Sequence, residues 1–192
     1  MDPLLGGVVL GLSVAAPPGP NAALCMAETL AGGRGAGLRA GCGVASAHAL
    51  YATLALVGAG RASEWITREA RAVRLLAGLV LVGLALRLEL TRGRPRSPSS
   101  RVFAITLGLG LVNPLTLLYF SAAVALGVLP TGAGPLVVAG VFAGSAAWWA
   151  VLATAVAGLG RRLDDRRLAW ANRAAALTIA GFGGIAIATV LT

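Results

Sequence analysis

The residues best suited to chemistry are Asn21 and Asn113, two polar side chains that interrupt apolar runs. Asn21 follows Pro17–Pro20, and Asn113 stands directly before Pro114. Proline has no N–H group and clashes with the preceding turn, so neither run can continue as one regular helix. A helix that stops leaves free carbonyl groups, which attract a cation, and a helix that restarts presents free N–H groups, which attract an anion. This pair of helix ends suits an amino acid, which carries an ammonium and a carboxylate close together.

The predicted substrate site gathers residues from both interruptions. Gly19 has no side chain, so a ligand can approach the backbone closely there. Each asparagine adds a hydrogen-bond donor and an acceptor. The predicted substrate-binding residues are Pro18, Gly19, Pro20, Asn21, Asn113, Pro114 and Ser145. The alternative is that both interruptions are kinks that relieve packing and bind nothing.

His48 is the chain's only histidine, and it lies within an apolar run. Its imidazole titrates near neutral pH, and ionisable groups at membrane depth are costly and usually functional. We therefore assign His48 to proton coupling or substrate binding, with Ser145 as its partner. The alternative is a neutral imidazole that only joins two helices through a hydrogen bond to Ser46 or Ser145.

Glu28 and the pair Trp148 and Trp149 each allow two interpretations. Glu28 lies about two helical turns beyond the first interruption and is the second residue assigned to proton coupling. It could instead pair with Arg34 or Arg39 or attract a cationic substrate, and the alternative that we favour is a solvated charge at a helix end. The two tryptophans either line the pathway or have a structural role, as anchors at the membrane interface or in the packing of the helix bundle.

The composition is that of a membrane protein. Of 192 residues, 57% are hydrophobic and 12% are charged, with a mean hydropathy of +0.83. Soluble domains have about 25% charged residues. A membrane helix needs about 20 apolar residues, so this length has room for about six spans and for no soluble domain beside them. No basic residue precedes Arg34, so the first run lacks the charged start of a cleavable signal peptide and is expected to be retained.

The apolar runs predict six membrane helices in an all-α chain. They cover approximately residues 4–27, 40–60, 75–90, 102–126, 136–159 and 173–191. The glycine-rich segment 28–39 between the first two runs is predicted to be a short loop. Residues 91–101 carry four arginines and two prolines, which is typical of a linker. This linker divides the chain into three-helix units at 1–90 and 102–192.

The two units are predicted to be inverted copies of one another. Residues 43–51 and 140–148 both begin with Gly-Val and end in an aromatic residue, which pairs His48 with Ser145. The prolines of the two interruptions pair at nearly the same offset, so the first and fourth helices are both broken. Three helices per unit is an odd number, so the second unit enters the membrane upside down. Many secondary transporters have this plan and bind substrate near the midplane, at paired broken helices.

The charges indicate orientation in the membrane. All sixteen basic residues are arginines, and the net charge is +9. Twelve of the sixteen lie in or beside the segments that follow the first, third and fifth predicted helices. The positive-inside rule therefore places the linker in the cytoplasm and both termini outside it. Arginines confined to such segments do not indicate a nucleic-acid partner. Cys25 and Cys42 match no metal-ligand spacing and are predicted to be buried free thiols, so no metal or cofactor is expected.

Several short motifs resemble the lysine exporter and homoserine/threonine resistance family over nearly the whole chain. They are Pro-Gly-Pro-Asn at 18–21, Arg-Gly-Ala-Gly-Leu-Arg-Ala-Gly at 34–41, Asn113-Pro114, Gly-Ser-Ala-Ala-Trp-Trp at 144–149 and Asn172-Arg173. The resemblance implies a bacterial inner-membrane protein that exports amino acids or close derivatives, driven by the proton gradient. The chain departs from the family in two places: members often have an acidic residue where this chain has His48, and a lysine where it has Leu115.

The resulting prediction is a secondary transporter that exports amino acids by proton antiport in the lipid bilayer. Because no acidic residue is expected deep in the spans, a neutral amino acid is favoured over a basic one. The alternative is an exporter or channel for another small solute or cation. A membrane enzyme is disfavoured, since one histidine without interior acids does not form a catalytic cluster. The sequence leaves the oligomeric state open and allows a homodimer.

Overall fold

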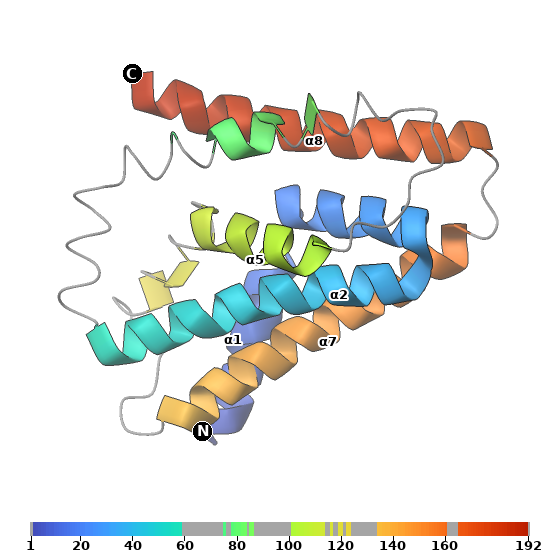
Figure 1. The fold of residues 1–192 in the computed structure, drawn as a ribbon. Coiled ribbons are helices and arrows are strands. Elements are labelled where there is room, and N and C mark those ends of the chain that lie inside the picture. The colour runs from blue at the N-terminus through green and yellow to red at the C-terminus, as the bar shows by residue number, and fades with distance from the viewer. Residues whose placement is uncertain are drawn as a thin grey trace.

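The computed structural model describes residues 2–58, 75, 78–83, 85, 86, 101–113, 116, 119, 120, 122, 123, 134–160 and 165–191. All regular secondary structure in these residues is helical, as predicted (Figure 1). The labelled helices are α1 (Pro3–Ala15), α2 (Pro20–Gly58), α5 (Val102–Val112), α7 (Gly134–Gly160) and α8 (Asp165–Leu191).

Among these helices, α7 is long and apolar enough to cross a membrane, with a mean hydropathy of 1.9 over its best window. The pair Pro3–Ala15 and Pro20–Leu56 also meets the requirement if the bent pair counts as one span. Helix α5 and the segment Arg173–Ile185 of α8 are apolar but shorter.

The prediction of six spans cannot be followed through the whole chain. Residues 76, 77, 84 and 87–90 of the predicted span 75–90, most of residues 114–126 and residues 91–100 of the linker lie outside the described residues. The division into units at 1–90 and 102–192 therefore stays a prediction.

Helix α1 begins and ends with residues suited to those positions. The Asp2 side chain accepts hydrogen bonds from the N–H groups of Leu4 and Leu5, at 2.8 and 3.2 Å, and so caps the first turn. At the other end, the N–H of Ala16 still donates to Leu12. Ala16 keeps helical dihedral angles (φ −68°, ψ −37°) although it precedes a proline, so the chain leaves the helix only after it. Residues 16–19 are not helical, and the axes on either side differ by 82°.

Helix α2 contains a reversal at Gly33. This residue has φ 71° and ψ −172°, angles that a residue with a Cβ adopts only under strain. Figure 1 shows that the N-terminal half of α2 (20–32) and its C-terminal half (34–58) run in opposite directions. The predicted loop over 28–39 is therefore wrong, since Gly33 alone departs from helical geometry. A turn at one residue leaves fewer backbone groups unpaired than a twelve-residue loop would, which matters where water is scarce.

Helices α1 and α7 touch through their backbones. Gly7 and Gly11 on α1 face Gly140 and Gly144 on α7. A methyl group on Gly7 or Gly11 would overlap the carbonyl oxygen of the α7 residue opposite it, and the reverse holds for both α7 glycines. Two Gly-x-x-x-Gly pairs thus meet, an arrangement that lets membrane helices approach closely.

The C-terminal half of α2 lies between α5 and α7. The hydroxyl of Thr106 on α5 donates to the carbonyl of Ala40 at 2.8 Å, and Gly43 leaves the space that Thr106 occupies. Gly41, two residues earlier, makes room for Trp149 of α7 in the same way. The N-terminal half of α2 packs against α8 in an apolar cluster that includes Leu24 and Ile179. Helix α2 therefore contacts each of the other labelled helices.

We expect Gly11→Ala and Gly144→Ala to lower the free energy of unfolding by about 1–3 kcal/mol each, because the added methyl group must displace backbone. Thermal unfolding of the purified protein in detergent measures this. Gly108→Ala on α5 is the matched control: nothing lies within 4 Å of its added methyl group, so its stability should stay equal or rise slightly. Equal stability of all three variants would contradict the close α1–α7 contact.

Candidate functional site

A cavity of about 40 Å³ lies where α1 ends and α2 begins. Its walls come from both sides of this interruption, from the C-terminal half of α2, from the segment after α5 and from α7. The lining residues are Val14, Ala15, Pro17, Gly19, Pro20, Asn21, Ala22, His48, Asn113, Thr116, Tyr119 and Trp149. Residues that are as much as 135 positions apart in the sequence, Val14 and Trp149, thus line one small space.

Five residues of the predicted site line this cavity: Gly19, Pro20, Asn21, His48 and Asn113. Three other predicted residues, which the structure describes, do not line it. Ser145 is buried directly behind His48, Pro18 is exposed on the other side of the interruption, and Glu28 is buried elsewhere on α2. Pro114 lies outside the described residues.

The cavity lies between opposite ends of two helices. The carbonyls of Ser13, Val14 and Ala16 have no intrahelical donor, because the residue four positions later is a proline in each case. On the other side, the carbonyl of Gly19 accepts the first helical hydrogen bond of α2 from Ala23, at 3.1 Å. The N–H groups before Ala23 therefore have no acceptor within the helix. One wall of the cavity thus carries partial negative charge and the other partial positive charge.

His48 and Ser145 form a buried hydrogen bond between α2 and α7. The Nδ1 atom of His48 lies 2.9 Å from the hydroxyl oxygen of Ser145, and neither side chain is more than 2% exposed. The ring of Phe120 lies at a tilted angle to the imidazole, with 6.3 Å between ring centroids. Ser46, the other proposed partner, is only half-buried. Ser145 is therefore the partner of His48, and it is also the residue that the predicted repeat pairs with His48.

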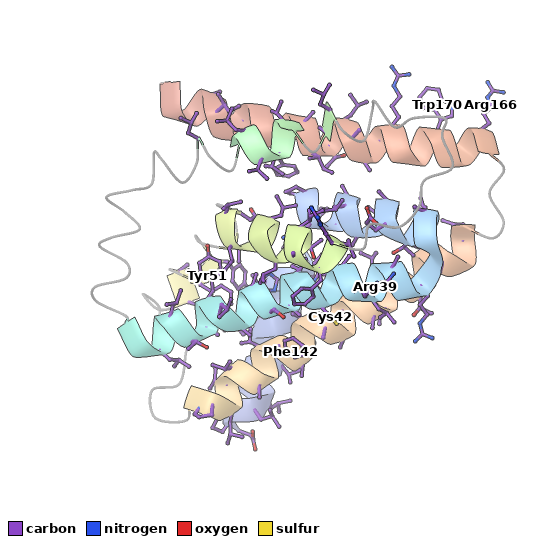
Figure 2. All side chains as sticks on the ribbon, in the orientation of Figure 1. Arg39, Cys42, Tyr51, Phe142, Arg166 and Trp170 are labelled. Carbon is purple, nitrogen blue, oxygen red and sulfur yellow. The ribbon has the colours of Figure 1, made fainter. Side chains whose placement is uncertain are left out.

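The end of α5 is held by Tyr51. Asn113 is extended (φ −73°, ψ 113°), as a residue before proline prefers, and its N–H donates to Gly110 at 3.4 Å. The hydroxyl of Tyr51 donates to the carbonyl of Leu111, and Figure 2 shows Tyr51 beside this end of α5. The sequence did not assign a role to Tyr51. A usable signal is its position three residues after His48, on the same face of the helix.

Trp149 is the cavity residue on which the sequence left two interpretations open. It is 3% exposed and lines the cavity, whereas its neighbour Trp148 is half-buried and does not. The interfacial alternative is therefore wrong for Trp149. Its position four residues after Ser145 places the two side chains on one face of α7, which is the signal that could have identified it.

Two polar atoms in the cavity walls are unsatisfied. Within the described part of the chain, Oδ1 of Asn21 and Nε1 of Trp149 are buried and have no hydrogen-bond partner. Buried polar atoms nearly always have a partner, and the exceptions call for an explanation.

The structure corrects two expectations about side chains outside the cavity. Glu28 is 2% exposed, so it is not a solvated charge, and Arg34 and Arg39 are both exposed. Glu28 lies on the same face of α2 as Asn21, seven residues further on. Cys42, predicted to be buried, is exposed, because its neighbours on either side face α7 and α5 and leave it pointing outward. Cys25 is buried as predicted.

The described residues contain no group of three histidine, cysteine or acidic side chains that could hold a metal ion. At the far end of the molecule, Arg166 and Trp170 project from α8 away from the other helices, as Figure 2 shows.

Helix α7, and the bent pair of α1 and α2 if it counts as one span, are long and apolar enough to cross a membrane, as expected of a membrane protein. The chain belongs to the LysE type translocator family, whose model matches residues 12–189. Comparisons with curated proteins and with solved structures gave no match. The resemblance seen in the sequence is thus confirmed, and the chain is a membrane protein that transports a small molecule.

We expect Tyr51→Phe to lower the free energy of unfolding by about 1–3 kcal/mol, because the carbonyl of Leu111 loses its buried donor. Thermal unfolding in detergent again provides the measurement. Thr53→Val is the control, since the exposed Thr53 hydroxyl bonds only to Ala49 in the same helix and should change stability by less than about 0.5 kcal/mol. If Tyr51→Phe were as stable as Thr53→Val, Tyr51 would not hold the end of α5.

Proposed function

We propose that this translocator exports amino acids or close derivatives across the bacterial inner membrane by proton antiport. The observation that carries the proposal is the single cavity that Asn21, His48 and Asn113 line together. It combines helix ends of opposite polarity with two amide side chains and a titratable group. These are the elements needed to bind a zwitterion and to couple its movement to a proton.

The binding of a zwitterion follows from the polarity of the cavity walls. The carbonyl end of α1 would face the substrate's ammonium, and the N–H end of α2 would face its carboxylate. Gly19 stands between these ends, and nothing lies within 4 Å of the position where a Cβ would be. This opening lets a ligand reach the backbone directly.

The cavity has to enlarge before it can hold a substrate. Its volume of about 40 Å³ has room for water, whereas small-molecule sites usually measure about 300–1,000 Å³. We infer that the structure represents a contracted state, and that the helix ends on either side of residues 16–19 separate when the substrate enters.

The contact between His48 and Ser145 supports the proposal of two inverted units at 1–90 and 102–192. Residues related by a two-fold axis can touch only where they lie close to that axis. The sequence pairs His48 with Ser145, and the two side chains are hydrogen-bonded. In this plan the chain has six spans, the first and fourth of them broken at Pro17–Pro20 and at Asn113-Pro114. The distribution of arginines places both termini outside the cytoplasm, and a homodimer is compatible with this arrangement.

His48 is proposed as the proton carrier. Its partner Ser145 can donate a hydrogen bond to the neutral ring or accept one from the protonated ring, so the pair persists in both states. Glu28 is the second proposed coupling group, because it is a buried ionisable side chain on the face of α2 that also carries Asn21. Glu28 does not line the cavity and so does not provide a counter-ion there for a basic side chain. A neutral amino acid therefore remains the favoured substrate.

The test of this function is transport into inverted membrane vesicles that contain the protein. We expect saturable uptake of at least one radiolabelled amino acid from a panel of twenty, driven by an acidic vesicle interior and lost when a protonophore collapses the gradient. Flux that neither saturates nor responds to the gradient would favour a channel. If uptake of every amino acid were no greater than in vesicles without the protein, the proposed function would be wrong.

In the same assay, Gly19→Leu locates the site. Gly19 lines the cavity, and a Cβ there meets no atom within 4 Å, so we expect the leucine side chain to obstruct the cavity and abolish export while the protein folds normally. Gly108→Leu is the matched control, because it also adds a side chain in open space but lies away from the cavity, and it should transport at the wild-type rate. Normal export by a folded Gly19→Leu variant would mean that the interruption does not bind substrate.

A separate prediction concerns His48→Asn. Asparagine can still bond to Ser145 but cannot carry a proton, so we expect gradient-driven accumulation to disappear while substrate exchange across the membrane without a gradient continues. Accumulation assays at several pH values and counterflow assays measure these two activities. If the His48→Asn variant still accumulated substrate with the full dependence on pH, His48 would not be the proton carrier.

A further inference from the structure

Trp149 is a buried residue in the cavity wall whose polar atom has no partner. Its side chain is 3% exposed, and its indole Nε1 has no acceptor among the described residues. Buried tryptophans usually find a partner for this N–H group. The unsatisfied donor therefore indicates a partner that enters from the cavity.

Packing alone does not explain a tryptophan here. Its Cβ and ring root fill the space that Gly41 leaves on α2, which a phenylalanine would fill equally well. Trp149 also belongs to the apolar cluster that contains Ala15 at the end of α1, with Ala22 at the start of α2 packed against it. The indole thus lies at the junction of the two helix ends, where its N–H group adds one more donor.

Asn21 supplies the complementary atom. Its side chain is 6% exposed, lines the same cavity and has an unsatisfied Oδ1, which can only accept a hydrogen bond. The indole N–H can only donate. A ligand that satisfies both must therefore carry an acceptor and a donor on one small molecule.

We propose that Trp149 is a substrate ligand that donates its indole N–H to the substrate's carboxylate, while Oδ1 of Asn21 accepts a hydrogen bond from the substrate's ammonium. This inference rests on the proposed function, because it assumes an amino-acid substrate in this cavity. It adds that the site distinguishes amino acids from related molecules by their carboxylate. A charged acceptor strengthens the hydrogen bond from the indole, so an amino acid binds better than its uncharged carboxamide.

The experiment compares the wild type with Trp149→Phe, which keeps the ring and its contact with Gly41 but removes the donor. The probes are an equimolar mixture of neutral L-amino acids and the matching mixture of their carboxamides. The measurement is the concentration of each mixture that raises the unfolding temperature of the purified protein in detergent by the same fixed amount.

For the wild type we expect the amino acids to stabilise the protein at about 10- to 100-fold lower concentration than the carboxamides. For Trp149→Phe we expect this difference to become clearly smaller, because the indole donor is lost while the N–H groups at the start of α2 still face the carboxylate. Trp148→Phe is the matched control, since this neighbouring indole does not line the cavity, and it should behave like the wild type.

Two outcomes separate failure of this inference from failure of the proposed function. If the wild type prefers amino acids and Trp149→Phe keeps the same preference, Trp149 is not the carboxylate ligand, but the function stands. If neither mixture stabilises the wild type, both proposals fall.

A readout on the unaltered protein covers the case in which Trp149→Phe does not fold. With ¹⁵N-labelled tryptophan, the four indole N–H groups of the chain give separate resonances, and spectra of Trp65→Phe, Trp148→Phe and Trp170→Phe assign that of Trp149 by elimination. We expect the amino-acid mixture to move this resonance and the carboxamide mixture to move it less. An unmoved Trp149 resonance at saturating amino acid would overturn the inference.

Discussion

The missing N–H groups of Pro17, Pro18 and Pro20 are the constraint on which the site depends. They leave the last carbonyls of α1 without helical donors, and the chain turns by 82° before α2 begins. In water such a turn would be ordinary. Inside a bundle of apolar helices it places unpaired carbonyls opposite unpaired N–H groups, and the cavity lies between them. The polar walls of the cavity thus arise from backbone atoms first, and the side chains of Asn21 and His48 add to them.

Much of this could be predicted from the sequence, because the signals are local. Apolar composition indicates helices in a membrane, and three prolines within four residues indicate an interruption wherever they occur. The pairing of His48 with Ser145 also came from a short pattern. The structure brings those two side chains together and places Asn21 and Asn113 on one cavity, while Pro114 lies outside the described residues.

The remaining features depend on packing between distant segments, which local patterns do not encode. Glu28 has the charge of a surface residue, yet the N-terminal half of α2 turns it inward. Trp149 and Trp148 are equivalent in the sequence, and only the approach of Gly41 decides which of them reaches the cavity. The glycine-rich segment at 28–39 has the composition of a loop, but a single reversal at Gly33 is enough to turn the chain.

The glycine contact between α1 and α7 has a mechanical consequence. Because the two backbones pack directly against one another, movement at this contact would have to displace backbone atoms, and we expect α1 and α7 to stay together. In the proposed plan of two units, α1 would belong to the first unit and α7 to the second, so this contact would join the units. Opening of the cavity must then use the N-terminal half of α2, which is joined to α1 by residues 16–19 and to the rest of α2 by Gly33. With a hinge at each end and α8 packed along its side, this short helix is the segment we expect to swing.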